Sequence, residues 1–150
     1  MNTALPNLAF PPIEARIVEE SRGVMIFDAV RSRYVRLTPE EWVRQHLIGF
    51  LISHRGVPLS LVAVEKGFDV SGQSKRADVV VYRRDGRPWL LAECKAPGVA
   101  IGDAALRQVA RYARVIHADV LALTNGLRHE AFAVASGALT PLEDLPAYPA

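Results

Sequence analysis

The chain has 150 residues, of which 50% are hydrophobic and 23% are charged. This composition is typical of a globular domain with its own hydrophobic core, and it excludes a disordered polar tail. The charges nearly cancel, because 18 Lys and Arg face 16 Asp and Glu for a formal net charge of +2. Net charge alone therefore does not indicate a nucleic-acid-binding protein, and a functional site must be located in the sequence.

Secretion signals, disulfides and membrane spans find no support in the sequence. Residues 1–10 have neither a basic start nor a long apolar run, and no later apolar run approaches the roughly 18 to 20 residues of a membrane span. The single cysteine, Cys94, cannot form an intrachain disulfide and suits a reducing compartment. We therefore expect a soluble, cytoplasmic protein with no membrane partner.

Proline-rich ends frame the chain. Residues 1–16 predict an irregular N-terminal arm, and residues 136–150 predict an irregular tail with at most a short turn. One domain is expected between them, over residues 17–135. It begins with short predicted strands within 17–26, interrupted at Arg22-Gly23, and over 33–37.

A helix is predicted over residues 39–54. Thr38 is a candidate N-cap, Pro39 suits the first helical position, and Glu41 completes a capping-box pattern three residues after Thr38. Gly56 then ends the segment. The apolar residues at helical spacing are Val43, Leu47, Phe50 and Leu51.

The rest of the chain combines short strands with a second helix. In chain order, the predicted elements are strands over 61–64 and 68–70, a polar loop over 71–75, strands over 77–82 and 89–94, a helix over 103–116, a strand over 120–123, and a last helix or strand. This order predicts an α/β domain with a mixed β-sheet core flanked by helices.

A hairpin is predicted around Asp85-Gly86, a pair that favours a two-residue turn. In the register that this turn sets, Asp78 lies directly opposite Glu93. Lys95 lies two residues beyond Glu93 and therefore projects from the same face of the sheet. A β-bulge would shift the pairing, but two carboxylates and an ammonium would still converge at this strand end.

Facing carboxylates on otherwise apolar strands repel each other, so a compensating charge is expected. Mg²⁺ fits, because it prefers carboxylate oxygens, keeps several waters and often bridges protein acids to phosphate; Mn²⁺ is its expected substitute. Asp78 and Glu93 would hold the ion, with the backbone carbonyl of Cys94 as a further ligand. Lys95 would position an attacking water or stabilise developing negative charge. The alternative is a surface salt bridge between Lys95 and either acid.

Asp78 followed by Glu93-Cys94-Lys95 resembles the PD-(D/E)xK nuclease superfamily. The chain also resembles the N-terminal nuclease domain of type I restriction enzyme R subunits, from about residue 26 to about residue 132. The stretches that carry this second resemblance are 37–45, 75–78, 93–97, 123–126 and Gln108-x-x-x-Tyr112. The resemblance implies a restriction-endonuclease-like fold and Mg²⁺-dependent hydrolysis of DNA, with Asp78, Glu93 and Lys95 in the roles described above.

Two features depart from these families. Arg76-Ala77 precedes Asp78 where the superfamily name has proline, which carries no chemistry. The R subunit continues into a motor, whereas this sequence contains no Gly-x-x-x-x-Gly-Lys-Ser/Thr phosphate loop. ATP-driven translocation is therefore not expected of this chain.

The resemblance further implies an acid on the first helix, for which Glu40 and Glu41 are both candidates. On a helical wheel, Glu40 lies about 40° from the centre of the apolar stripe and Glu41 about 140°. Because Glu41 already has a capping role, Glu40 is the preferred third acid and Glu41 stays open. Stabilisation of the helix dipole is the alternative for both.

Gln108 and Tyr112, four residues apart, share one face of the second predicted helix, from which an amide and a phenol could reach a DNA phosphate. The alternative is a half-buried core tyrosine with a solvated glutamine beside it. Nearby basic residues extend this candidate phosphate-binding surface. They are Lys75, Arg76, Arg83, Arg84, Arg87, Arg107, Arg111 and Arg114.

The leading hypothesis is a Mg²⁺-dependent endodeoxyribonuclease of restriction or defence type. Its partners would be DNA and either a second copy of the chain or a partner subunit that supplies target choice. The alternative is a nuclease-fold module that binds DNA or a partner without cleaving. The sequence leaves DNA and RNA open as substrates, since it shows no aromatic ladder for single strands.

Overall fold

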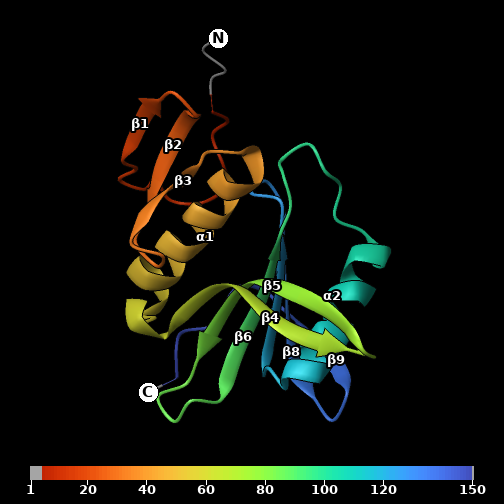
Figure 1. The fold of residues 1–150 in the computed structure, drawn as a ribbon. Coiled ribbons are helices and arrows are strands. Elements are labelled where there is room, and N and C mark those ends of the chain that lie inside the picture. Colours follow the sequence, from red (N-terminus) through yellow and green to blue (C-terminus); the bar gives the residue numbers. More distant parts are fainter. Residues whose placement is uncertain (1–4, 150) are drawn as a thin grey trace.

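The computed structural model describes residues 5–149. This part of the chain contains two β-sheets and two α-helices (Figure 1). The first sheet has the order β1-β2-β3 and the second has the order β4-β5-β6-β7-β8-β9. The elements are β1 (Ile17–Glu20), β2 (Gly23–Asp28), β3 (Arg33–Arg36), α1 (Pro39–Arg55), a 3₁₀ turn (Leu59–Leu61), β4 (Val62–Val70), β5 (Gln73–Tyr82), β6 (Pro88–Cys94), α2 (Asp103–Ile116), β7 (Val120–Thr124), β8 (His129–Ala135) and β9 (Ala138–Leu142).

The six-stranded sheet lies between the two helices (Figure 1). Strand residues alternate between its faces, so that Val79 and Val81 pack with the α1 residues, while Val80 packs with the α2 residues. Strands β6 and β7 are parallel and the other neighbours are antiparallel. The predicted mixed sheet with flanking helices is therefore confirmed.

Helix α1 begins as predicted, since the Thr38 hydroxyl accepts a hydrogen bond from the backbone N–H of Glu41 at 3.0 Å. It ends at Gly56, which has a φ of 75° and so adopts the left-handed conformation that glycine tolerates. The capping box is only half formed, because the Glu41 side chain bonds to arginine and glutamine side chains instead of returning to Thr38.

The structure corrects the prediction for residues 61–75. One continuous strand, β4, replaces the two short ones, and β5 already begins at Gln73, so that Lys75 and Arg76 lie in a strand instead of a loop. The turn is confined to Ser71 and Gly72, with φ values of 52° and 81°. A two-residue turn of this kind suits the twist of a hairpin, and an edge strand with its partner accommodates exposed polar residues.

The predicted irregular tail over 136–150 is wrong for its first part, because residues 138–142 form β9 and pair with β8. Ser136 and Gly137 make the turn, with φ values of 51° and 77°. Pro141 is tolerated because β9 is the edge strand, where a missing N–H disrupts no further pairing. The preceding element, left open as helix or strand, is strand β8.

Residues 5–16 contain no helix or strand and run along the domain. The Ala9 N–H donates to the Gly126 carbonyl at 2.7 Å, and the Trp42 indole donates to the Pro6 carbonyl at 2.9 Å. Leu8 and Phe10 pack against the core on the α1 side. Among residues 5–149, no helix has the length and hydropathy needed to cross a bilayer.

Candidate functional site

The β5–β6 hairpin places the candidate acids, but through a different turn from the one predicted. The backbone N–H of Arg83 donates to the Arg87 carbonyl at 2.7 Å, and Tyr82 pairs with Pro88. These contacts leave a three-residue loop, in which Gly86 has a φ of 90°. A register shift between Val81 and Tyr82 then restores the predicted pairing further along the strands. The two-residue turn was wrong, whereas the register around Val79–Ala92 is as predicted, because the bulge offsets the extra loop residue.

Asp78 lies where β5 leaves regular pairing on both sides. The regular ladder with β6 runs only as far as Val79, and the ladder with β4 skips the position of Glu65, whose φ is 52°. Ala77 packs on the α2 side of the sheet and Val79 on the α1 side, although strand alternation would give them one face. Because the strand is irregular here, the Asp78 carboxylate does not take the position that regular strand alternation would give it.

The structure brings Asp78, Glu93 and Lys95 to one place. Oδ2 of Asp78 accepts a hydrogen bond from the backbone N–H of Cys94 at 2.7 Å. Nζ of Lys95 lies 3.4 Å from Oε1 of Glu93. The three side chains are partly buried, with exposed fractions of 16% for Asp78, 15% for Glu93 and 28% for Lys95. Two carboxylates and one ammonium therefore meet at the end of β6, within reach of solvent.

Both carboxyl groups have raised pKa values, chiefly because they are buried. Burial raises the pKa of Glu93, and the charge of Asp78 raises it further, to about 7, although Lys95 acts in the opposite direction. Burial likewise raises the pKa of Asp78, against the Cys94 N–H and the positive charge of Arg44. Burial therefore disfavours the ionised form of both carboxyl groups in the metal-free protein.

The two acids at the start of α1 have separate environments. Partial burial and the charge of Asp78 raise the pKa of Glu40, while the charges of Arg44 and Lys95 lower it. The Glu40 carboxylate therefore interacts electrostatically with the residues of the candidate site. Among residues 5–149, Glu40 makes no side-chain hydrogen bond or ion pair. Glu41 is buried and bonded to arginines. The preference for Glu40 as the acid beside Asp78 agrees with this geometry, and it stays a prediction.

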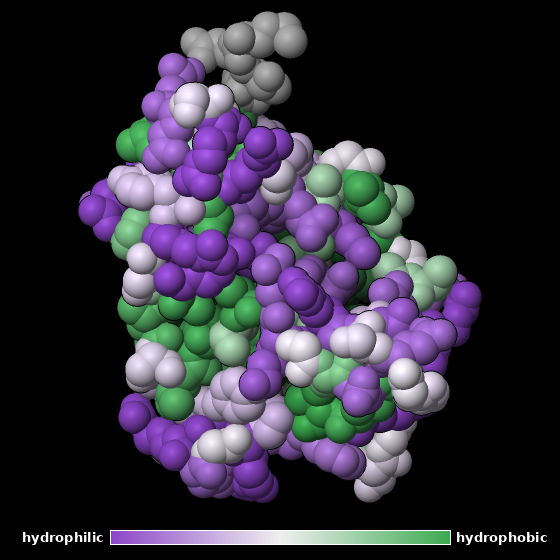
Figure 2. Space-filling model, in the orientation of Figure 1, coloured by the Kyte–Doolittle hydropathy of each residue, from purple (hydrophilic) through white to green (hydrophobic). Residues whose placement is uncertain are grey.

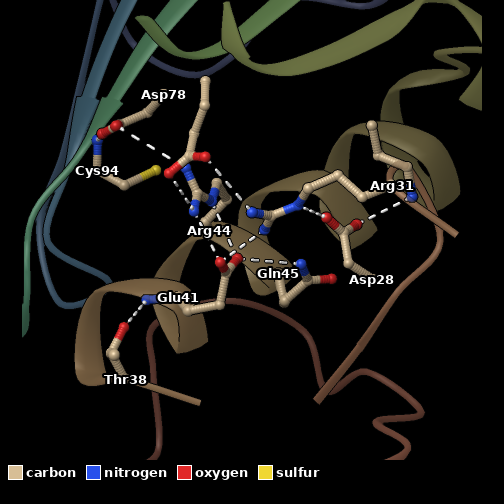
Figure 3. A network of polar contacts seen from close by, with 10 residues as sticks. Asp28, Arg31, Thr38, Glu41, Arg44, Gln45, Asp78 and Cys94 are labelled. Atoms are coloured by element: carbon tan, nitrogen blue, oxygen red, sulfur yellow. Dashed lines mark hydrogen bonds and ion pairs between the residues drawn. The ribbon is translucent and has the colours of Figure 1, made fainter. Parts of the chain in front are cut away.

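A buried ion network joins α1, the loop after β2 and strand β5 (Figure 3). The guanidinium of Arg44 bonds to Glu41 at 2.9 and 2.7 Å and lies 3.9 Å from Oδ1 of Asp78. Arg31 bonds to Glu41 at 2.6 Å and also to Asp28, which is 0% exposed. Burial would raise the pKa of Glu41, but Arg44, Arg31 and a glutamine amide hold it at about 2.

Sequence reasoning missed the arginines of this network and Glu65. Both Arg31 and Arg44 lie 3.7 Å from a carboxylate oxygen of Glu65, a residue of β4. The three-residue spacing of Glu41 and Arg44 was a readable sign of an ion pair on a helix. The contributions from β4 and from the loop after β2 had no local sign, because they depend on the tertiary fold.

Asp78 and Glu93 suit Mg²⁺, which commonly takes one or two protein carboxylates and completes its shell with waters and substrate phosphate. No third His, Cys, Asp or Glu side chain in the described part of the chain joins them in a ready-made ligand cluster. The Cys94 side chain is 1% exposed, and burial raises the pKa of its thiol, so a thiolate ligand is disfavoured. Only the backbone carbonyl of Cys94 remains as a candidate ligand from this residue.

Five of the ten predicted phosphate-binding residues line a cleft of about 560 Å³ between α2 and the β4–β5 hairpin. Its lining includes Lys75, Arg107, Gln108, Arg111 and Tyr112. The amide of Gln108 donates to the Tyr112 hydroxyl at 3.0 Å. The tyrosine ring is buried against Phe68, so it is a core aromatic whose hydroxyl lies at the cleft. Arg76 is exposed and does not line this cleft.

A comparison with family models identifies one family. A family model described as type I restriction enzyme R protein N terminus matches residues 39–146. Among solved structures, a fragment described as an HsdR subunit of a type I restriction enzyme from Vibrio vulnificus YJ016 has a TM-score of 0.56 and 22% identity. The alignment covers 74% of this chain and 24% of that one, so this chain spans about a quarter of that protein fragment. No curated protein matches the sequence.

Proposed function

Because the chain belongs to the family of type I restriction enzyme R protein N-terminal regions, we propose that it is a Mg²⁺-dependent endonuclease that hydrolyses DNA phosphodiester bonds. The observation that carries the proposal is the meeting of Asp78, Glu93 and Lys95 at a strand end where two carboxylates lack full compensation. A divalent cation would favour the ionised form of these two buried carboxylates, so Asp78 and Glu93 are suited to take one.

In the proposed reaction, Asp78 and Glu93 hold the metal, which supplies charge stabilisation to the phosphoryl group when bound. Lys95 donates hydrogen bonds from its ammonium to the attacking water or to a phosphate oxygen, and its contact with Glu93 fixes its direction. Glu40 interacts electrostatically with Asp78 and Lys95, and its carboxylate can orient the water by accepting a hydrogen bond. The main chain N–H of Cys94 fixes the Asp78 carboxylate and leaves its Oδ1 free of that bond.

The Gln108–Tyr112 cleft extends the proposed DNA path. Lys75 lines this cleft and lies three residues before Asp78 on β5, a separation of about 10 Å along a strand. A nucleic-acid strand at Asp78 can therefore pass the cleft, where the Gln108 amide and basic side chains such as Arg111 offer hydrogen bonds to phosphates. Arg76, exposed on the same strand, belongs to the same proposed path.

A second function is a nuclease-fold module that binds DNA or a partner subunit without cleaving it. The observation that favours it is the missing third ligand, since no three candidate side chains gather among residues 5–149. Calorimetric titration with Mn²⁺ separates the two functions. Metal binding that disappears in Asp78→Asn supports the nuclease, whereas DNA binding without carboxylate-dependent metal binding supports the module.

Cleavage of supercoiled plasmid tests the proposal directly. Wild-type protein should nick or cut with Mg²⁺ or Mn²⁺ and should be inactive in EDTA. Asp78→Asn and Lys95→Ala should each lower the rate by about 10²- to 10³-fold, the loss typical of removing one transition-state charge contact. Asp85→Asn, at the far tip of the hairpin, is the matched control and should keep full activity. Equal activity in wild type and Lys95→Ala would overturn the proposal.

A further inference from the structure

A cleft of about 720 Å³ lies beside the candidate site, between the β1–β3 sheet and the first turn of α1. Glu40 and Glu65 line its acidic side, and Ala96, the residue after Lys95, connects it to the end of β6. Its other side is basic. The arginines that line the cleft are Arg22, Arg31, Arg33, Arg36 and Arg44.

These arginines differ in what neutralises them. Arg31 and Arg44 form ion pairs with the buried carboxylates of the ion network. Arg33 and Arg36 have no carboxylate within ion-pair distance among residues 5–149. One guanidinium nitrogen of Arg36 donates to the Arg22 carbonyl at 2.9 Å, which fixes the group without cancelling its charge. Arg33 and Arg36 therefore present two uncompensated positive charges to the cleft.

The β1–β3 sheet, which carries Arg33 and Arg36, is connected to the candidate site by hydrogen bonds and ion pairs. Strand β3 pairs with β2, whose last residue, Asp28, is fully buried and bonded to Arg31. The network continues through Glu41 and Arg44 to Asp78 (Figure 3). Hydrophilic side chains dominate the face of the molecule over the β1–β3 sheet (Figure 2). Arg33 and Arg36, which we call the basic wall, therefore line the same cleft as Glu40 and remain exposed to solvent.

We propose that Arg33 and Arg36 bind backbone phosphates of the DNA duplex whose scissile phosphate reaches Asp78 and Glu93. The inference rests on the proposed function. An acidic site repels a phosphate backbone, and guanidinium groups, which bind phosphate bidentately, offset that repulsion on the approach. Strand β3 precedes residue 39 and so lies outside the segment that the family model matches.

Duplex binding in EDTA tests this inference without requiring cleavage. Fluorescence anisotropy with a labelled DNA duplex longer than one helical turn gives the dissociation constant at several salt concentrations. Each lost phosphate contact lowers the slope of log affinity against log salt by about 0.9, so Arg33→Gln with Arg36→Gln should lower it by about 1.8. Arg33→Lys with Arg36→Lys keeps the charges and should keep most of the slope. Arg55→Gln, at the end of α1 far from the cleft and paired with Asp144, is the control and should match wild type.

The outcomes separate this inference from the proposed function. A wild-type slope in the double glutamine variant, or an equal loss in Arg55→Gln, overturns the role of the basic wall. Tighter binding of an RNA duplex, with the same dependence on the two arginines, overturns DNA as the ligand. Wild-type protein that binds DNA through these arginines but cleaves nothing with Mg²⁺ upholds the wall and overturns the nuclease. Circular dichroism of each variant verifies that it is folded.

Discussion

Two groups of acids lie side by side in this domain and differ in how they are compensated. Glu41 is buried, yet its pKa is about 2, because Arg31 and Arg44 bond directly to its carboxylate. The pKa of Glu93 is raised to about 7 by burial and by Asp78, and within residues 5–149 its one ion pair is with Lys95 at 3.4 Å. Both glutamates are shielded from solvent, so the difference between their pKa values comes from the charged groups around them. Compensated acids stabilise the fold, and uncompensated acids are available for a ligand.

The largest expected effect is on stability, in the Glu41→Gln variant. Its neutral amide leaves Arg31 and Arg44 buried without their main counter-ion, and breaking a buried ion pair from one side costs about 3 to 5 kcal/mol. Urea unfolding, followed by circular dichroism, measures the change in the free energy of unfolding. Glu19→Gln, on the exposed surface of β1, is the control and should stay within about 0.5 kcal/mol of wild type. A similarly small change in Glu41→Gln would remove the structural role assigned to the network.

Glu93→Gln should show the reverse pattern. Loss of one proposed metal carboxylate should lower Mg²⁺-dependent cleavage by about 10²- to 10³-fold. The free energy of unfolding in EDTA should not fall, because the substitution removes repulsion with Asp78. Plasmid cleavage and urea unfolding on the same preparation give both quantities. If Glu93→Gln unfolds as easily as Glu41→Gln, the division into structural and available acids fails.

The register that brings Asp78 and Glu93 together was predictable, because hairpin pairing depends on residues close in sequence. Apolar alternation sets which faces are buried, and it held the pairing at Val79–Ala92 even though the turn around Gly86 is longer than expected. The start of α1 was predictable for the same reason, since the Thr38 cap is a contact across three residues.

The environment of the site was not predictable, since it is assembled from segments far apart in the chain. Glu65 joins the arginines from β4, and Asp28 reaches them from a separate sheet. Hydrophobic periodicity predicted that Glu41 lies on a solvated face of the helix. Glu41 is buried because arginines cover that face, and a pattern of apolar residues cannot predict burial by charged side chains. Strand β9 was missed because Pro141 lowers strand propensity everywhere except at an edge.

Arg44 connects the two groups, so its substitution by lysine sharpens the comparison. Lysine keeps the charge but loses the paired bonds to Glu41, at a cost of about 1.5 to 3 kcal/mol in the free energy of unfolding. The shorter lysine would hold its charge farther from Asp78 and would lower the Asp78 pKa less, so the acid limb of the pH–rate profile should move to higher pH. A stability loss with an unchanged profile would restrict Arg44 to the structural network.

The smallest expected effect is the pH dependence of stability in EDTA, where the two glutamates have opposite signs. The pKa of Glu93 rises from 4.5 to about 7 on folding, so the folded state binds the extra proton and stability falls as pH rises through this interval. The pKa of Glu41 falls from 4.5 to about 2, so its contribution is present above 4.5 and is lost as pH falls towards 2. Urea unfolding from about pH 3 to about pH 8 should therefore show that Glu93→Gln flattens the decline between 5 and 7 while keeping the loss below 4.5. A wild-type slope between 5 and 7 in that variant would mean that Glu93 is already ionised in the metal-free fold, and the distinction between the two groups of acids would then rest on Glu41 alone.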